Sequence, residues 1–310
     1  MIRFRPSPNV HGRLQQPRQR TAWLLPVAAV LSLTHATANA SPEDLYEPPH
    51  DVEFSATGDS EPDGARALPR RDRADDASLL AIAPGTPWHL QLSGKLQEKT
   101  WAQVYDIDLF DTPAATIQSL VARGKKVHCY FSAGSYEDWR SDKGRYPAAV
   151  LGKPMDGWPG ERWVDIRSSA LRSVLAARMD LAKSKGCTGI DPDNVDGYGH
   201  DTGFPLKQSD TVDFVRWLAA QGHARGLTVG LKNGIEILTQ VSAAVDWAVN
   251  EQCNEYSECS AYRSFVASGK PVFNVEYKGT LSTICAKTKP LKLSTIKSTL
   301  ALNGPAEPCP

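Results

Sequence analysis

Short β-forming segments alternate with helical segments along most of the chain, and this alternation restricts the fold more than any other feature. From residue 87 the two kinds of segment follow one another about eight times over roughly 220 residues. Gly124, Gly186 and Gly226 stand directly after helical segments, where glycine typically ends a helix. We therefore expect an α/β fold, a single (β/α)8 TIM barrel over residues 85–310. An open doubly wound sheet is the alternative, but no glycine-rich phosphate turn follows the first strand.

The positions of the expected elements follow from this pattern. Strands are expected at 88–92, 104–109, 126–133, 188–190, 227–231, 246–249 and 271–277, with a short one at 163–166 in a long loop. Helices are expected at 114–123, 169–185, 208–225, 235–243 and 259–267, and a last helix and strand within 281–303. Thr112 is expected to cap the first helix, with Pro113 as its first residue.

A cluster of acidic residues lies in the stretch GCTGIDPDNVDGYG at 186–199. Asp191, Asp193 and Asp196 follow a short apolar run and are flanked by glycines. Three carboxylates this close raise at least one pKa unless a cation or a donor relieves their repulsion. Such a cost is typical of a site that binds or reacts, and a solvated acidic turn that caps the next helix is the alternative. Because Pro192 has no N–H, we expect regular sheet pairing to stop there.

Polar side chains also follow the other predicted strands. The carboxyl ends of the strands of a (β/α)8 barrel form one face, and active sites lie on that face. We therefore expect one cleft to gather Asp106, Asp108, Asp111, Tyr130, Ser132, Asp191, Asp193, Asn194, Asp196, Lys232, Asn233, Asn250, Glu251, Gln252, Glu276 and Tyr277. Paired carboxylates suit glycoside hydrolysis, in which one protonates the leaving oxygen and the other acts on the anomeric carbon or on water. Aromatic residues of the long loop, Trp163 among them, could stack on sugar faces.

Metal binding is the competing chemistry for the same acids. Counted from Asp191, an EF-hand needs Asp or Asn, Gly and Glu where this chain has Val195, Asp196 and Thr202. This match fails, and we expect no metal and no cofactor, with another kind of calcium or magnesium site as the alternative. No G-x-S-x-G motif supports a serine nucleophile.

The first 84 residues differ from the predicted barrel. Residues 1–40 carry five arginines and no acids, then an apolar run at 23–33 and small residues up to Ala40, which is typical of a secretory signal peptide. The apolar run is too short to span a membrane, although a retained signal anchor is the alternative. Residues 41–84 hold eleven acids and four arginines and are expected to be a disordered linker. We expect a secreted or periplasmic monomer with no membrane span after signal removal.

Residues 85–310 contain all six cysteines and have a nearly balanced charge. Sequence distance favours the disulfides Cys253–Cys259 and Cys285–Cys309, which leaves Cys129 for Cys187. Zinc ligation is the alternative, although the chain has no C-x-x-C pair. No basic run long enough to bind nucleic acid appears in 85–310.

Seven segments, taken in order, show a more specific pattern. They are YDIDLFD at 105–111, CYFSAGS at 129–135, GWPGERW at 157–163, KGCTGIDPDNVDGY at 185–198, GLKN at 230–233, NEQC at 250–253 and VEY at 275–277. These blocks resemble the signature blocks of glycoside hydrolase family 114, over about 88–309. The resemblance implies a (β/α)8 barrel and endo-cleavage of α-1,4-linked galactosamine polymers. It also supports the Cys253–Cys259 disulfide, because the N-E-Q-C-x5-C spacing matches.

The resemblance also implies roles for individual residues. One Asp of the DPDN block and the Glu of the NEQC block are the proposed catalytic pair of the family, which implies Glu251 with Asp191 or Asp193. Asp191 is favoured because it sits nearest the strand, and Glu251 is expected to be the general acid/base, held protonated by acidic neighbours. The expected substrate-binding residues are Asp106, Asp108, Tyr130, Trp163, Asn194, Asp196, Tyr198, Lys232, Asn233 and Glu276.

The charge of such a cleft indicates the substrate. Acids from several strands would concentrate a polysaccharide whose de-acetylated sugars carry ammonium groups. The expected partner is therefore a cationic amino-sugar polysaccharide. A non-catalytic binder of the same polymer and a metal-dependent hydrolase are the alternatives, and the sequence leaves retention or inversion open.

Overall fold

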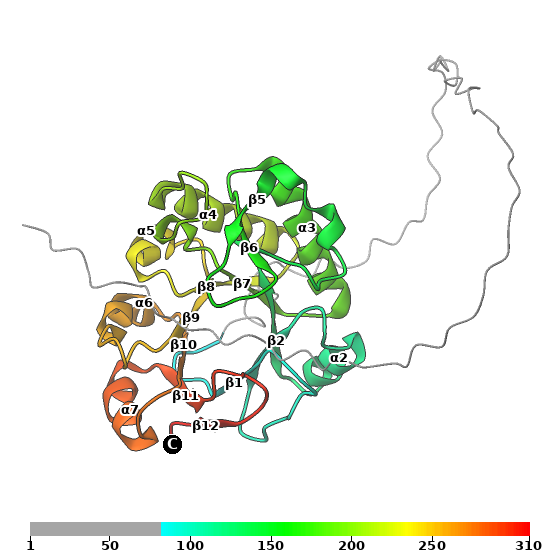
Figure 1. Ribbon diagram of the computed structural model, residues 1–310. Coiled ribbons are helices and arrows are strands. Elements are labelled where there is room, and N and C mark those ends of the chain that lie inside the picture. The colour runs from blue at the N-terminus through cyan, green and yellow to red at the C-terminus, as the bar shows by residue number, and fades with distance from the viewer. Residues whose placement is uncertain (1–81) are drawn as a thin grey trace, which may run out of the picture. The chain divides into compact units, whose positions relative to one another are not determined.

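The computed structural model describes residues 82–310, and these residues form a nearly closed parallel β-barrel surrounded by helices (Figure 1). Its parallel strands, in spatial order, are β1 (Trp88–Gln91), β2 (Val104–Asp108), β3 (Lys126–Ser132), β7 (Gly189–Asp193), β8 (Thr228–Lys232), β9 (Trp247–Glu251), β10 (Val272–Glu276) and β11 (Ser294–Ser298). Strand β12 (Ala306–Pro308) pairs with β11 in the antiparallel sense. The predicted TIM-barrel class is confirmed. The predicted signal peptide and the predicted linker up to residue 81 lie outside the described residues.

The helices lie close to their predicted positions. They are α2 (Ala114–Ala122), α3 (Ser169–Lys185), α4 (Gln208–Ala224), α5 (Leu238–Val241), α6 (Arg263–Ala267) and α7 (Leu281–Thr288), with short 3-10 turns η1 (Lys143–Arg145), η2 (Ala148–Val150), η3 (Gly197–Gly199), η4 (Ile235–Ile237), η5 (Cys259–Tyr262) and η6 (Lys289–Leu291). Helix α3 ends at Gly186, which has φ of 90°. Within residues 82–310, no helix combines the length and apolar character needed to cross a bilayer.

The start of α2 differs from the prediction. Pro113 has an extended backbone with ψ of 140°, so it is the N-cap and not the first helical residue, and no side chain caps this end. Thr112 lies one residue too early to serve as the N-cap, because the chain enters the helical conformation only at Ala114.

The long loop after β3 contains more structure than the sequence indicated. Strands β4 (Ser135–Glu137), β5 (Leu151–Pro154) and β6 (Glu161–Val164) form a separate antiparallel sheet in the order β4-β6-β5. The strand expected at 163–166 therefore begins earlier and has two partners. These pairings join residues up to 28 positions apart, from Ser135 to Trp163, which local sequence patterns do not reveal.

The prediction that sheet pairing stops at Pro192 is correct on one side of β7 and wrong on the other. Pairing between β7 and β8 ends before it, at Ile190 and Val229, whereas pairing between β7 and β3 continues to Asp193. Successive residues of a strand direct their backbone groups to opposite neighbours. The Asp193 carbonyl accepts a hydrogen bond from the Ala133 N–H at the end of β3, so the missing N–H of Pro192 falls on the β8 side, where the ladder has ended.

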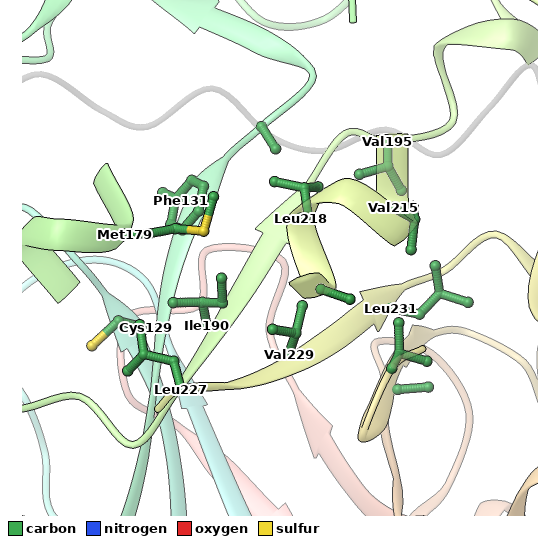
Figure 2. Close-up of a cluster of buried hydrophobic side chains, with 14 of the residues drawn as sticks. Cys129, Phe131, Met179, Ile190, Val195, Val215, Leu218, Leu227, Val229 and Leu231 are labelled. Atoms are coloured by element: carbon green, nitrogen blue, oxygen red, sulfur yellow. The ribbon is translucent and has the colours of Figure 1, made fainter. Parts of the chain in front are cut away.

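Two apolar layers build the core. One lies between the strands and helices and includes Cys129, Phe131, Met179, Ile190, Val195, Val215, Leu218, Leu227, Val229 and Leu231 (Figure 2). The other fills the barrel interior with Trp88, Leu90, Val104, Tyr130, Trp247, Val249, Phe273, Val275 and Ile296. Gly230 makes room for the interior layer, because a Cβ at this position would lie 2.1 Å from the Trp247 ring. The packed interior places the polar side chains at the carboxyl ends of the strands.

The three predicted disulfides are confirmed. They join Cys129 to Cys187, Cys253 to Cys259 and Cys285 to Cys309. All six cysteines are paired in this way, so the zinc alternative does not hold.

Candidate active site

The ammonium group of Lys232 lies among three carboxylates at the carboxyl ends of adjacent strands. Its Nζ atom is 3.7 Å from one oxygen each of Asp191, Asp193 and Glu251. These side chains come from β7, β8 and β9, and all of them are buried. Burial disfavours the charge of the lysine, but the carboxylates outweigh burial and raise the pKa of Lys232. The structure thus brings together four of the residues that the sequence assigned to one cleft.

Glu251 receives hydrogen bonds on both oxygens. The Tyr277 hydroxyl donates to Oε1 at 2.5 Å, and the Asn233 side-chain amide donates to Oε2 at 3.1 Å. Asn233 has a positive φ of 52°, and its Oδ1 accepts the Glu251 N–H at 2.9 Å. Burial and the charge of Glu251 raise the pKa of Tyr277 well above its usual value, so the tyrosine remains a donor. The sequence predicted acidic neighbours that hold Glu251 protonated, and it placed Lys232, Asn233 and Tyr277 in the same cleft. In the structure Lys232 is a nearby cation, and the other two residues donate hydrogen bonds to Glu251.

Asp193 is held in a comparable way. The Tyr130 hydroxyl donates to its Oδ2 at 3.0 Å, and the Asn194 N–H donates to its Oδ1 at 2.8 Å. Asn194 has a positive φ of 60°, and its side chain donates to Ser132 Oγ at 2.9 Å. Burial raises the pKa of Asp193, and the Lys232 charge opposes this shift.

Asp191 and Asp106 are more deeply buried than Asp193 and Glu251. Both side chains are fully buried, and no donor among the described residues forms a hydrogen bond with their oxygens. Burial raises the pKa of Asp191 to about 7. Burial and the charge of Asp191 raise the pKa of Asp106 well above its usual value. A pKa in the DPDN segment is therefore raised as expected, but burial is the largest cause, and the neighbouring charges of Asp193 and Glu251 add to it.

Asp108 and Glu276 have their oxygens engaged by the protein. Asp108 accepts two hydrogen bonds from Arg140, at 2.9 and 2.7 Å. Glu276 accepts the N–H groups of Asn254 and Glu255 at 2.8 and 3.3 Å, in the loop that follows Glu251. Both acids are buried, and their hydrogen bonds hold the loops that carry Arg140 and Asn254 in place.

The segment after β7 holds two further predicted residues, Asp196 and Tyr198, and a third, Trp163, lies on β6. Asp196 is partly exposed and lies 3.4 Å from His200, whose ring stacks on Trp163 with centroids 4.7 Å apart. One face of Trp163 is thus occupied by a protein ring. The Tyr198 hydroxyl donates to Glu236 at 3.3 Å. His200 was not among the predicted residues, and its spacing of four residues from Asp196 is the only sequence signal that points to it.

One group of metal-type ligands lies close together within the described residues. It consists of Cys253, Cys259 and Glu276, but both sulfurs belong to a disulfide and cannot act as thiolate ligands. In the acidic cluster, the Lys232 ammonium occupies the place between carboxylates that a cation would take.

Comparison with known proteins adds independent findings. The sequence profile of glycoside-hydrolase family GH114 matches residues 70–310. The crystal structure of Aspergillus fumigatus Ega3 in complex with galactosamine is 42% identical, with a TM-score of 0.71 over 74% of this chain and 96% of that chain. The glycoside hydrolase domain of PelA from Pseudomonas aeruginosa shares the fold, with a TM-score of 0.59 and 16% identity over 72% of this chain and 98% of that chain. A Deinococcus radiodurans protein is 26% identical over 261 residues, covering 74% of this chain and 83% of its own.

Proposed function

Because the chain belongs to glycoside hydrolase family GH114, we propose that it is an exported endo-glycosidase that cleaves α-1,4-linked galactosamine polymers. The observation that carries the proposal is a pair of carboxylates, Asp193 and Glu251, that each accept hydrogen bonds from the protein and each lie 3.7 Å from the Lys232 ammonium group. Three disulfides support an oxidising destination. The similarity to Ega3, which was crystallised with galactosamine, supports the choice of sugar.

Accessibility supports Asp193 over Asp191 as the partner of Glu251. The side chains of Asp193 and Glu251 are each 7% exposed, whereas that of Asp191 is 0% exposed. A carboxylate that acts on a sugar must touch it, so we assign the catalytic pair to Asp193 and Glu251. Sequence position alone favoured Asp191. Asp193 Oδ2 and Glu251 Oε2 each lie 3.7 Å from Lys232 Nζ, so these two oxygens are no further apart than twice that distance. This range suits two acids that act on one glycosidic bond.

The two acids have different roles in the proposed reaction. Glu251 protonates the leaving glycosidic oxygen, and the short hydrogen bond from Tyr277 orients its carboxyl group. Asp193 attacks the anomeric carbon or stabilises its developing positive charge. Tyr130, the Asn194 N–H and Lys232 favour the Asp193 anion against the effect of burial, as this role requires. Glu251 then accepts a proton from the water that completes hydrolysis.

The charge of the site supports a cationic substrate. Asp106, Asp191, Asp193 and Glu251 surround a single lysine, and the partly exposed Asp196 lies beyond them. A buried excess of carboxylates attracts a polymer with ammonium groups and offers less to a neutral or anionic glycan.

The test uses partly de-acetylated galactosaminogalactan and measures the release of reducing ends. Glu251→Gln and Asp193→Asn are each expected to lower kcat by about 10²- to 10⁴-fold, because each removes an acid that acts in the reaction. The control is Asp180→Asn, whose carboxylate is exposed and pairs with Arg225. Circular dichroism must show that each variant is folded. Wild-type protein that binds the polymer without releasing reducing ends would identify a non-catalytic binder, and full activity in either catalytic variant would refute the assigned pair.

A further inference from the structure

Two buried carboxyl groups lie beneath the proposed catalytic pair and have no part in the reaction as proposed. Asp106 from β2 and Asp191 from β7 are both 0% exposed. Their four oxygens receive no hydrogen bond from any N–H or O–H group of the described residues. The two carboxyl groups interact with each other inside the barrel. Since buried acceptors without donors are costly, this pair needs a proton or a nearby cation.

The surrounding strands supply few groups that could meet this need. Asp193, Lys232 and Glu251 face the pair from β7, β8 and β9, and Tyr130 from β3 and Tyr277 after β10 direct their hydroxyls to Asp193 and Glu251. His128 on β3 stacks on Trp247 with centroids 3.8 Å apart. Burial lowers the pKa of His128 to about 3, so it carries no charge at neutral pH. Lys232 is therefore the one cation next to the pair within the described residues.

Lys232 connects the pair to the catalytic carboxylates. Its Nζ atom is 3.7 Å from Asp191, and it is equally far from Asp193 and from Glu251. A negative charge on Asp191 therefore competes with the catalytic acids for the same ammonium group. Two adjacent buried carboxyl groups do not both ionise readily, and such pairs hold a proton between them.

We propose that Asp106 and Asp191 share one proton and that the charge of this pair, acting through Lys232, sets the protonation of Asp193 and Glu251. The second half of this proposal rests on the proposed function. The two residues are positioning residues, because neither reaches the substrate. When Asp191 ionises, its negative charge offsets part of the positive charge of Lys232. The Glu251 carboxylate is then less stabilised, which favours the protonated form of this general acid. Since the pKa of Asp191 lies at about 7, this occurs in the neutral range.

The proton-sharing half is tested on the folded protein without substrate, by carbon-13 NMR titration of the aspartate carboxyl groups. Wild-type Asp191 is expected to titrate near neutral pH. Asp106→Asn removes a like charge but keeps a donor, so the Asp191 titration should move to lower pH by about one unit or more. Asp106→Leu removes the donor and should move it to higher pH. Titration of wild-type Asp191 below about pH 5, or no difference between the two variants, would overturn proton sharing.

The catalytic half is tested by the pH dependence of kcat. Asp191→Asn removes the charge and should still cleave the polymer. In this variant the alkaline limb of the pH profile, where kcat falls as the pH rises, should move to lower pH by about one unit or more. Asp106→Leu should displace the limb in the same direction, whereas Asp106→Asn should leave it in place. A merely structural role would reduce the rate at every pH without moving the limb. Loss of cleavage at all pH values in folded Asp191→Asn would overturn the proposal and make Asp191 the catalytic acid.

Failure of the proposed function gives a different result. Wild-type protein that does not cleave the polymer refutes that function and the catalytic half of this inference. The NMR titration still decides whether Asp106 and Asp191 share a proton.

Discussion

Replacing Lys232 by Met should destabilise the protein strongly, and more at high pH than at low pH. The side chain keeps most of its apolar stem, so the change chiefly removes a buried cation with three carboxylates at 3.7 Å. At that distance and an effective dielectric constant of about 20, each pair contributes about 4.5 kcal/mol of attraction. Much of this offsets the cost of burying the ammonium group. Breaking a buried ion pair leaves uncompensated charge, so the expected loss of unfolding free energy is about 3–5 kcal/mol at pH 8.

The pH dependence of the Lys232→Met effect follows from the carboxylates that remain. The pKa values of Asp191 and Asp193 are already raised by burial, and the lysine is the largest influence that holds them down, so they rise further without it. A group with a raised folded pKa keeps its stability below the unfolded pKa, near 4, and loses it as pH rises through the folded pKa. The loss in the variant should therefore be small near pH 4.5 and increase steadily up to pH 8.

The assay is urea unfolding at pH 4.5, 6 and 8. The matched control is Lys278→Met, which removes an exposed lysine paired with Glu255 and should leave the midpoint unchanged at each pH. An equal loss at all three pH values in Lys232→Met would refute the electrostatic reasoning and point to packing. An equal loss of unfolding free energy in the control would refute the argument that Lys232 contributes more to stability because it is buried.

Three further changes give direct tests. Gly134→Ala should abolish cleavage, because a Cβ would lie 1.6 Å from the Asn194 carbonyl oxygen, whereas Gly144→Ala meets nothing within 4 Å and should be neutral; equal rates in both would contradict this. Replacing Cys129 and Cys187 by serine opens a link of sequence separation 58, and urea unfolding should show a loss of about 4 kcal/mol, with a loss under about 1 kcal/mol counting against it. Treatment with EDTA should leave reducing-end release unchanged, since a lysine occupies the centre of the acidic cluster; restoration of a lost activity by Mg²⁺ or Ca²⁺ would contradict this.

Sequence determined the order of the elements because their signals are local. Helix α3 has its predicted bounds, since a glycine at a positive φ ends it. The disulfides also follow from sequence, because close spacing leaves few choices. The end of β7 and the N-cap of α2 were less well predicted, because proline restricts the backbone without fixing which hydrogen bonds its neighbours make.

Partners of individual side chains were decided by tertiary structure. Asp106 and Asp108 lie two residues apart on one face of β2, yet Asp106 faces Asp191 inside the barrel and Asp108 binds Arg140 from the loop after β3. Alternation along a strand gives each residue its face, and the sequence carries that information. Closure of the barrel and the path of a distant loop decide what lies opposite. For the same reason, the sequence placed Asp191, Asp193, Lys232 and Glu251 together at one end of the barrel, but only the assembled strands put the lysine at the same distance from three of the acids.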